Sequence, residues 1–430
     1  MNLFLKRKGY YYGEVLGEII YKKNKTAKAF YSIQTGAPYV IDSIFVKCGN
    51  SAVSGAYNKF LRKKKESMGI DPLKGQLFDL DYLSSYRDDI AKYMRNEALY
   101  GFNATNITMS VDTNKTTKKV ILGLVFGARM IPSTVNKDSL VAVSQAPARI
   151  HEVHYHLSDT SMLKVPFTTY LNNPSLEIKD SIDNQFLKTK NILFYKELFY
   201  TKKKREEKHI KDKDSLNPER MVFIHFNGKQ PIISADILEL QNYLEMTNIY
   251  KEDYLERSYR SLNQLGVFST IKPTIIELPG HLLDVHYFLT PAKKQSFSFD
   301  PKFTSSFGLL GTAASIKYTN KNLFGGAEKL TLTLGGGFES QPAVFDDGTR
   351  SGTSFNTFEF GPSLKLDMPG LFPVKRNATS SKRIKPRTEI STAFNFQVRE
   401  DFSRQLFQLN YLWKFQNTKK DQLFQFGLPG

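Results

Sequence analysis

The sequence predicts two kinds of structure in succession: α+β units up to about residue 291, and a sheet of long antiparallel strands from Gln295 onward. Two observations support this. Before residue 291 the order helix, glycine near an aromatic residue, strand, turn, strand occurs more than once. After Gln295 apolar and polar residues alternate, and no helical period is left. Because successive side chains of a strand point to opposite faces, this alternation indicates strands.

The clearest α+β unit spans residues 250–289. Its helix places Leu255, Tyr259 and Leu262 on one face, at the spacing of an amphipathic helix. A glycine and an aromatic residue follow the helix, and then two strands joined by a Pro-Gly turn. The second of these strands, 281–289, has the alternation of a half-buried strand.

The same order occurs earlier, in residues 79–126. Upstream of it, residues 39–46 predict an opening strand and residues 50–64 a first helix. Residues 1–37 resemble the end of one more unit whose helices are cut off. The N-terminal part therefore carries a diverged repeat of one supersecondary unit.

For the last unit the sequence leaves two candidates for the opening strand, residues 149–157 and residues 221–226. The first helix is expected in residues 233–244. A polar insert, near 158–218, lies between the two strand candidates and ends in a run of charges. Such a run cannot bury itself, so we expect a mobile loop or extension there.

The C-terminal strands begin around one loop, Asn322–Glu328. From Leu330 to Leu334 three leucines alternate with two threonines, so one face is aliphatic and the other carries hydroxyl groups. Seven strands are expected, in residues 296–305, 314–319, 330–334, 355–368, 388–400, 405–416 and 422–428.

The polarity of the two faces of these strands distinguishes a membrane barrel from a soluble β-sandwich. Strands of about 10 residues can cross a bilayer when tilted, whereas sandwich strands are usually shorter. The apolar faces are rich in Phe and Leu, and the polar faces mix opposite charges, as in a barrel with lipid outside and water inside. The sequence therefore predicts strands of a transmembrane β-barrel. Such a barrel must close, and bacterial ones have at least about eight strands, so we expect the chain to be part of a longer protein.

The composition argues against several other classes of protein and of site. The net charge of +18 suggests nucleic acid, but part of it lies in loop-like runs that suit a solvated surface, namely Arg62–Lys65, Lys202–Arg205 and Lys375–Lys385. The single cysteine, Cys48, excludes an internal disulfide and a metal site of several cysteines. No stretch has the roughly 18 apolar residues of a transmembrane helix.

Three stretches carry a resemblance to a known superfamily: Thr35–Ile44, Asp253–Phe268 and Tyr318–Glu328. With β-α-α-β-β repeats leading directly into membrane strands, the chain resembles the outer-membrane assembly superfamily of the BamA/TamA type, whose repeats are called POTRA domains. The third stretch is similar to that family's turn between the second and third barrel strands. The resemblance implies α+β POTRA repeats followed by an antiparallel transmembrane β-barrel segment that is incomplete, with about seven strands.

The implied organisation has four parts. We expect the C-terminal part of a POTRA domain in 1–37, a POTRA domain in 38–129, a further one with the polar insert in 130–291, and the first barrel strands in 295–430. A signal sequence, the start of the first repeat, the later strands and the family's Val-Arg-Gly-Phe signature are missing from this sequence.

The resemblance also implies a function. Family members open a seam beside the first barrel strand and template the strands of unfolded outer-membrane proteins there. The chain is thus expected in the bacterial outer membrane, with its POTRA domains in the periplasm. Its expected partners are unfolded barrel proteins, outer-membrane lipid and accessory assembly subunits, and no nucleic acid. The residues assigned to client pairing on the first strand are Ser296, Phe297, Ser298, Phe299, Lys302 and Phe303.

Two further features fit this expectation. Pro301 removes one backbone donor and disfavours uninterrupted pairing, although it also suits an ordinary strand start or a bulge. A POTRA repeat can add a client strand along the strand that follows its glycine and aromatic residue. For the last repeat that edge is assigned to Ser269, Thr270, Ile271 and Ile275.

Motifs for catalysis are absent: we find no phosphate loop, no nucleophile elbow and no zinc-binding helix, so we expect neither an enzyme nor a cofactor. Within His151–His156, the side chains of His154 and His156 share a face and could hold a metal with a third ligand from elsewhere. We interpret them instead as polar positions of a partly exposed strand and expect no metal. Gly335–Gly337 is taken as small residues that ease strand curvature.

Two alternatives stay open. A two-partner secretion pore of the same superfamily would export one cognate protein. A soluble, basic nucleic-acid-binding protein would instead show a steep dependence of DNA affinity on salt.

Overall fold

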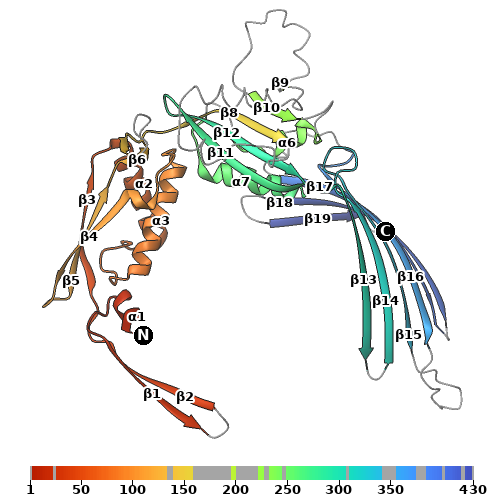
Figure 1. Cartoon of the computed structure of the whole chain (residues 1–430), viewed down its shortest axis with the longest axis horizontal. Coiled ribbons are helices and arrows are strands. Elements are labelled where there is room, and N and C mark those ends of the chain that lie inside the picture. The colour runs from red at the N-terminus through yellow and green to blue at the C-terminus, as the bar shows by residue number, and fades with distance from the viewer. Residues whose placement is uncertain are drawn as a thin grey trace, which may run out of the picture.

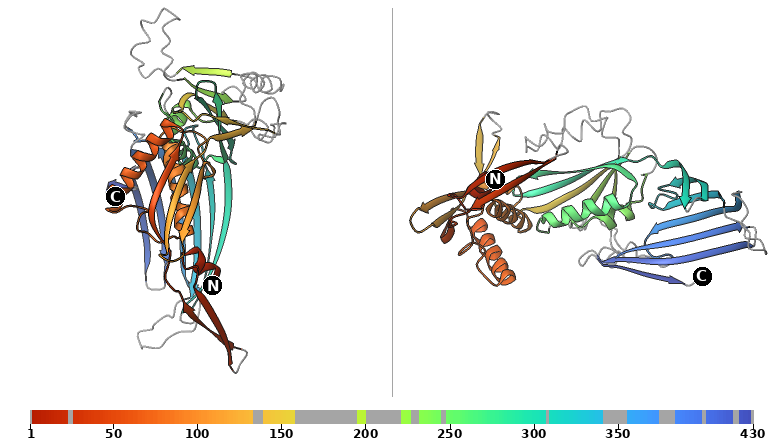
Figure 2. Two further views of the ribbon diagram at one scale, coloured as in Figure 1. Left: turned by 90° about the vertical axis from the view of Figure 1, so that its left-hand side faces the viewer. Right: turned by 90° about the horizontal axis from the view of Figure 1, so that it is seen from below.

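The computed structural model describes residues 2–22, 26–132, 139–157, 195–199, 221–226, 232–244, 248–306, 309–340, 355–373, 384–399, 402–417 and 422–428. Along the chain, an N-terminal hairpin, two α+β units and a sheet of long strands follow one another (Figure 1). Figure 2 shows the long strands forming a curved sheet at the end of the molecule away from the hairpin. In the described residues no helix is both long and apolar enough to cross a bilayer.

The N-terminal part is a short helix followed by a hairpin: α1 (Asn2–Arg7), β1 (Glu14–Lys22) and β2 (Thr26–Gln34). Every residue of β2 is exposed. Gly9 joins the helix to the hairpin at a φ of 87° and accepts a hydrogen bond from Tyr39 N at 2.9 Å. A Cβ at this position would lie 2.9 Å from Phe78 O, so the next unit approaches too closely for any larger residue.

The middle unit has the order β-α-α-β-β that the sequence predicts. Its elements are β3 (Val40–Cys48), α2 (Ser51–Met68), α3 (Leu80–Asn96), a 3-10 turn η1 (Ala104–Asn106), β4 (Ile107–Asn114) and β5 (Lys119–Phe126). The sheet order is β3-β5-β4, with β3 parallel to β5. The apolar side chains of both helices pack on one face of this sheet and form the core of the unit.

Both helices of the middle unit begin at a side-chain cap. Asn50 Oδ1 accepts from the backbone N of Ala52 at 2.9 Å, and Asp79 Oδ1 accepts from Asp81 N at 2.8 Å. Each cap satisfies donors that a helix start leaves without partners. The basic run Arg62–Lys65 lies on α2, where Lys64 pairs with Asp89, which fits the solvated surface expected for it. The other two basic runs lie mostly outside the described residues.

The last unit repeats this order and adds strands. Its elements are β8 (Arg149–Leu157), α6 (Ala235–Gln241), α7 (Glu252–Gln264), β11 (Phe268–Leu278) and β12 (Leu282–Pro291), together with β9 (Tyr195–Phe199) and β10 (Met221–Phe226). The sheet order is β11-β12-β8-β10-β9. Because β8 pairs with β12 in parallel, as β3 does with β5, β8 is the opening strand of the unit and β10 is an addition. A short hairpin of β6 (Arg129–Pro132) and β7 (Leu140–Val143) connects the two units.

Three expectations for this unit need correction. Residues 195–199 of the polar insert form a strand because they pair with β10; the rest of the insert lies outside the described residues. Tyr259 is 39% exposed, since Ser258, Ser261 and Leu262 form the buried face of α7. β12 is buried on both faces and not on one, because it is an inner strand of the sheet.

The C-terminal sheet consists of the expected antiparallel strands in sequence order. They are β13 (Gln295–Ser306), β14 (Leu309–Asn320), β15 (Lys329–Ser340), β16 (Phe355–Pro369), β17 (Ile384–Val398), β18 (Ser403–Asn417) and β19 (Gln422–Leu428). Six of the seven have 12 or 15 residues, a length that crosses a bilayer when tilted. Gly335–Gly337 lies inside β15 and pairs with both neighbouring strands.

The two faces of this sheet differ as a barrel wall requires. One cross-strand row aligns Phe297, Tyr318, Leu332 and Leu364. The row one residue further along β13 aligns Ser298 with Lys317, Thr333 and Ser363. Since adjacent rows point to opposite faces, one face is apolar and the other polar. This is the pattern of a sheet with lipid on one side and water on the other.

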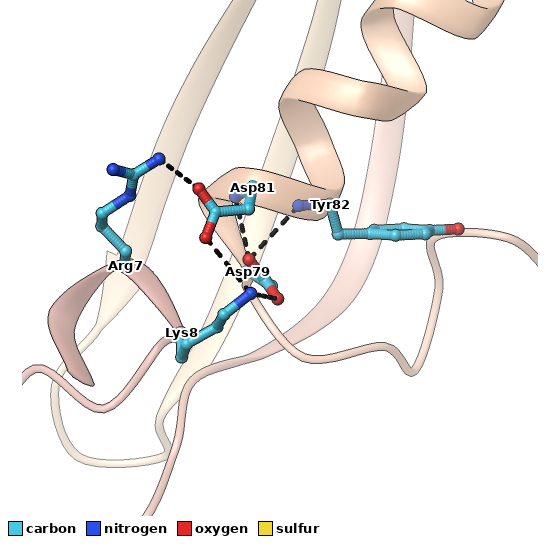
Figure 3. Close-up of polar contacts among 5 residues, drawn as sticks. All are labelled: Arg7, Lys8, Asp79, Asp81 and Tyr82. Carbon is cyan, nitrogen blue, oxygen red and sulfur yellow. Dashed lines mark hydrogen bonds and ion pairs between the residues drawn. The ribbon is translucent and has the colours of Figure 1, made fainter. Parts of the chain in front are cut away.

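Polar contacts join the three N-terminal parts, and α3 makes contacts at both ends. At its start, Lys8 Nζ lies 2.8 Å from Asp79 Oδ2 and 3.2 Å from Asp81 Oδ2, and Arg7 also pairs with Asp81 (Figure 3). At its C-terminal end, Asn96 Oδ1 accepts from Asp253 N at 2.9 Å, at the first turn of α7.

Candidate functional site

The candidate site is the edge strand β13. In the described part of the chain β13 pairs with β14 alone, so the backbone groups along its other side face no strand. Phe297, Phe299 and Phe303 on this strand are 74%, 64% and 82% exposed. A long edge with large exposed apolar side chains is a template for another strand. The assigned residues Ser296, Ser298 and Lys302 lie on the same edge strand.

Pro301 lies inside this strand, in a ladder without interruption. Asp300 pairs with Ser315, Pro301 with Ala314 and Lys302 with Ala313, and the register does not shift. The alternative that Pro301 marks a strand start or a bulge is therefore wrong. Proline within a sheet is confined to edges, because it has no N–H to donate, and this position obeys that rule.

The second predicted edge, β11, is also at the border of its sheet. Thr270 and Ile271 pair with Thr290 and Leu289 of β12, and both isoleucines assigned to this edge, Ile271 and Ile275, pack against the core. A partner strand would thus meet backbone groups here and not the isoleucine side chains. Ser269 departs from the expectation, because the register shifts between Phe268 and Thr270 and its hydroxyl donates to Thr290 O at 3.2 Å.

The polar face of the C-terminal sheet carries a network of charges. Glu389 pairs with Lys365 at 2.8 Å and also with Lys414. Arg387 pairs with Asp367 at 2.9 Å. These five residues, three basic and two acidic, come from three neighbouring strands and pair with one another on the polar face of the sheet. Charges on a lipid face would instead destabilise the sheet.

The loop Asn322–Glu328 between β14 and β15 attaches the sheet to the last α+β unit. Asn322 Nδ2 donates to Ile232 O at 2.8 Å, and Gly325 O accepts from Ser234 N at 2.9 Å. Ala327 is 1% exposed and belongs to the core cluster of the last unit. The loop that the sequence marks as a turn therefore completes the hydrophobic core of a different part of the molecule.

A cavity of about 510 Å³ lies where the sheet meets this unit. Gln241, Ser261 and Gln264 line it from α6 and α7. The charged residues that line it from the sheet and its loops are five basic ones and one carboxylate: Lys321, Lys329, Asp367, Lys385, Arg387 and Lys414. Lys385 Nζ donates to Gln264 Oε1 at 2.8 Å across the junction. Sequence reasoning did not find this cavity, because its two sides are far apart in the chain.

No protein-family model matches the chain, and no curated protein matches it. Among solved structures, BamA from Haemophilus ducreyi lacking POTRA domains 1-3 matches with a TM-score of 0.35 and 10% identity over 88% of this chain. POTRA3-5 of Haemophilus influenzae BamA matches with a TM-score of 0.31 and 11% identity, over 67% of this chain and 76% of that one.

CdiB from Acinetobacter baumannii matches with a TM-score of 0.28 and 11% identity over 91% of this chain. The chain spans 60% of the length of the H. ducreyi BamA chain and 61% of the CdiB chain. In fold, the chain has α+β units of the order β-α-α-β-β followed by a sheet of long antiparallel strands.

Sequence reasoning found only part of a cluster of histidines and carboxylates in the last unit, because it singled out His154 and His156 and not their neighbours on β12. His154 and His156 are 5% and 2% exposed, so the expectation of a partly exposed strand is wrong. Asp284 and His286 of β12 lie beside them. The alternation of polar residues on both strands was the available signal, but the sequence does not show that the two strands are neighbours.

Proposed function

We propose that this chain acts in the assembly of outer-membrane proteins, by holding unfolded barrel clients along POTRA edges and pairing their strands with β13. The observation that supports this is the edge position of β13 in a sheet of membrane-length strands with one apolar and one polar face. An incoming strand gains backbone hydrogen bonds there, and alternate side chains meet the two faces. No catalytic step is part of the proposal.

In this proposal the C-terminal sheet lies in the bacterial outer membrane and the α+β units lie in the periplasm. Lipid contacts the apolar face, and the charged network around Glu389 faces water. Unfolded barrel proteins are the partners, with accessory assembly subunits beside the α+β units, and nucleic acid is not one of them.

Disulfide crosslinking tests the pairing. In the full chain with Cys48→Ser, which removes its single native cysteine, we introduce Ser298→Cys on β13 and incubate it with an unfolded barrel protein carrying cysteines in its terminal strand. The matched control is Ser363→Cys on β16, which lies in the same cross-strand row but has strand partners on both sides. We expect a crosslink for Ser298→Cys and none for Ser363→Cys.

Equal crosslinking at both positions, or at neither, would remove the templating claim. The parallel experiment for the POTRA edge compares Thr270→Cys on β11 with Thr290→Cys on the inner strand β12. Only the edge position is expected to capture client.

A second candidate function is export of one cognate protein through a pore, and the charged face around Glu389 favours it, since a water-filled channel needs such a lining. Planar-bilayer conductance separates the two functions. A stable open channel without crosslinking at Ser298→Cys supports export, and crosslinking to barrel clients without a stable channel supports assembly.

A further inference from the structure

The cavity between the C-terminal sheet and the helices α6 and α7 lies where the strands of the sheet end. Lys329 is the first residue of β15, Pro369 is the last of β16, and Lys385 is the second of β17. On the other side, Gln241 ends α6 and Gln264 ends α7. The cavity of about 510 Å³ therefore lies between strand ends and helix ends, and its size is typical of ligand sites.

The charged side chains of this cavity carry a net positive charge. Five of them are basic and one is acidic. Arg387 pairs with the acidic one, Asp367, and Lys414 pairs with Glu389 outside the lining. In the described part of the chain, three lysines of the lining form no ion pair: Lys321, Lys329 and Lys385. The cavity thus has positive charge that its own carboxylate does not balance.

The basic groups of the sheet share its polar face. Lys329 lies opposite Asp367 across β15 and β16, and Arg387 lies opposite Lys414 across β17 and β18. Lys385 precedes Arg387 by two residues, so its side chain points to the same face. The basic groups therefore form a band across neighbouring strands.

This band is longer than one small anion. From Lys329 on β15 to Lys414 on β18 it crosses three strand spacings, about 14 Å along the sheet. A single phosphate contacts only part of such a band, whereas about four residues of an extended peptide cover it. The side-chain amides of Gln264 and Gln416 add hydrogen-bond donors that suit peptide carbonyl groups.

Lys385 is held at the junction without a carboxylate. Its Nζ donates to Gln264 Oε1 at 2.8 Å and lies 6.0 Å from the centroid of the Tyr243 ring. An ammonium group that is partly removed from water is unfavourable unless a compensating charge accompanies it. A carboxylate in the cavity supplies that charge.

The position of the cavity also favours a ligand that arrives from water. Lys329 lies on the face of β15 that carries Thr331 and Thr333, opposite to the face of the leucines. In the proposed function lipid contacts the apolar face. The cavity is lined from the polar face, so a polypeptide in water reaches it more directly than a lipid headgroup does.

We propose that this cavity binds an acidic segment of an extended polypeptide. Carboxylates of the segment pair with Lys321, Lys329 and Lys385, and its backbone carbonyl groups accept hydrogen bonds from the amides of Gln264 and Gln416. This inference rests on the proposed function, because the polypeptide is an unfolded client, and it adds the kind of client segment that is held between the last α+β unit and the sheet.

Peptide binding to the full chain in a non-ionic detergent tests the proposal. One probe is a short peptide that alternates aspartate with serine, and the matched probe has asparagine in place of aspartate; both carry the same zwitterionic fluorophore. Fluorescence anisotropy should show saturable binding of the acidic probe to the wild type and no binding of the neutral one. This comparison uses the wild type alone, so it does not depend on the folding of a variant. Equal binding of both probes, or of neither, would overturn the proposal.

Lys321→Gln combined with Lys329→Gln tests the location of the site. The expected loss of affinity for the acidic probe is about 4- to 25-fold, since each ion pair at a partly exposed position contributes a factor of about 2 to 5. The matched control combines Lys28→Gln on β2 with Lys317→Gln on β14, neither of which lines the cavity. It removes the same charge and should bind within about twofold of wild type, because distant charges are screened. Equal losses in the two double variants would place the binding outside the cavity and refute the assignment.

Competition distinguishes an acidic segment from other anions. Inorganic phosphate, and an anionic phospholipid added to the micelles, should displace the acidic probe no better than sodium chloride of the same ionic strength. Stronger displacement by either one would assign the cavity to a small anion or to a headgroup and contradict the proposal. The crosslink at Ser298→Cys is measured separately: a crosslink without probe binding refutes this inference alone, and probe binding without a crosslink refutes client pairing at β13 alone.

Discussion

Asn322→Ala should loosen the attachment of the C-terminal sheet to the last α+β unit. Asn322 is 6% exposed, and its side chain makes two contacts at this junction. Nδ2 donates to Ile232 O at 2.8 Å, and Oδ1 accepts from Ala327 N at 2.9 Å. The substitution removes both contacts without introducing a larger side chain.

The magnitude follows from the burial of the two groups that lose a partner. Ala327 is 1% exposed, so leaving its N–H without an acceptor costs about 1–3 kcal/mol. Ile232 is 48% exposed, so its carbonyl can bind water and loses only the net value of one hydrogen bond, about 0.5–1.5 kcal/mol. Together these give about 1.5–4.5 kcal/mol, which corresponds to an opening constant roughly 10- to 1,500-fold larger.

Hydrogen exchange on the full chain in detergent measures this opening. Peptides that contain the amides of Ala327 and of Ser234, which donates to Gly325 O, should exchange faster by that factor. Phe324→Ala is the matched control in the same loop, because Phe324 is 77% exposed. Asn322→Asp keeps the acceptor and should fall between wild type and Asn322→Ala. Exchange at wild-type rate in Asn322→Ala would refute the assignment of this loop as the attachment.

Three further predictions concern the α+β units. Asp79→Ala removes the cap of α3 and should lower the free energy of unfolding by about 0.5–2 kcal/mol in denaturant titrations. Burial raises the pKa of Asp79, but hydrogen bonds from Lys8 and from backbone amides outweigh burial and hold that pKa below its ordinary value. The hydrogen bond from Lys8 also lowers the pKa of Asp81. In turn, the contact with these two carboxylates raises the pKa of Lys8. The two carboxylates therefore stabilise the contact fully above the ordinary Asp pKa of about 3.9, and this stabilisation is lost as the pH falls through their lowered pKa values. Lys8 stabilises the contact fully below the ordinary Lys pKa of about 10.4, and this stabilisation is lost as the pH rises through its raised pKa. Exchange protection of α1 should thus be greatest between these limits, and a protection that rises at acid pH would contradict this. Gly101→Ala places a Cβ at a φ of 75° against the guanidinium of Arg129, which an ion pair with Glu277 at 2.7 Å holds in place. Thermal unfolding should show a loss of about 1–3 kcal/mol, more than for Gly69→Ala, whose Cβ would meet nothing within 4 Å.

Local patterns predict most of the fold. The strict alternation from Leu330 to Leu334 identifies a strand without any tertiary information, and the same holds for the other long strands. The middle unit is predictable because its helices carry capping residues at Asn50 and Asp79 and its strands are short apolar runs. Sequential antiparallel pairing then gives the order of the C-terminal sheet directly, since consecutive strands usually lie side by side.

The candidate sites depend on pairings that local patterns do not contain. Whether β8 or β10 opens the last unit is decided by the parallel register between β8 and β12, and the same register brings His154 beside His286. The periodicity of α7 favoured Tyr259 as a buried residue, but serines occupy that face because Ser258 Oγ accepts a hydrogen bond from Tyr243 N at 2.9 Å. The bulge at Ser269 likewise follows from pairing and not from residue type.

The contacts at the two ends of α3 have a mechanical consequence. Its 17 residues give a rod about 26 Å long. Lys8 holds the N-terminal end, and Arg95 pairs with Glu252 of α7 at 2.7 Å beside the other end. A rotation of the last unit should therefore move the N-terminal hairpin with it. The distance between spin labels on β2 and α7 should be narrowly distributed in the wild type, and should broaden when Arg95→Ala and Asn96→Ala together remove the contacts with Glu252 and Asp253.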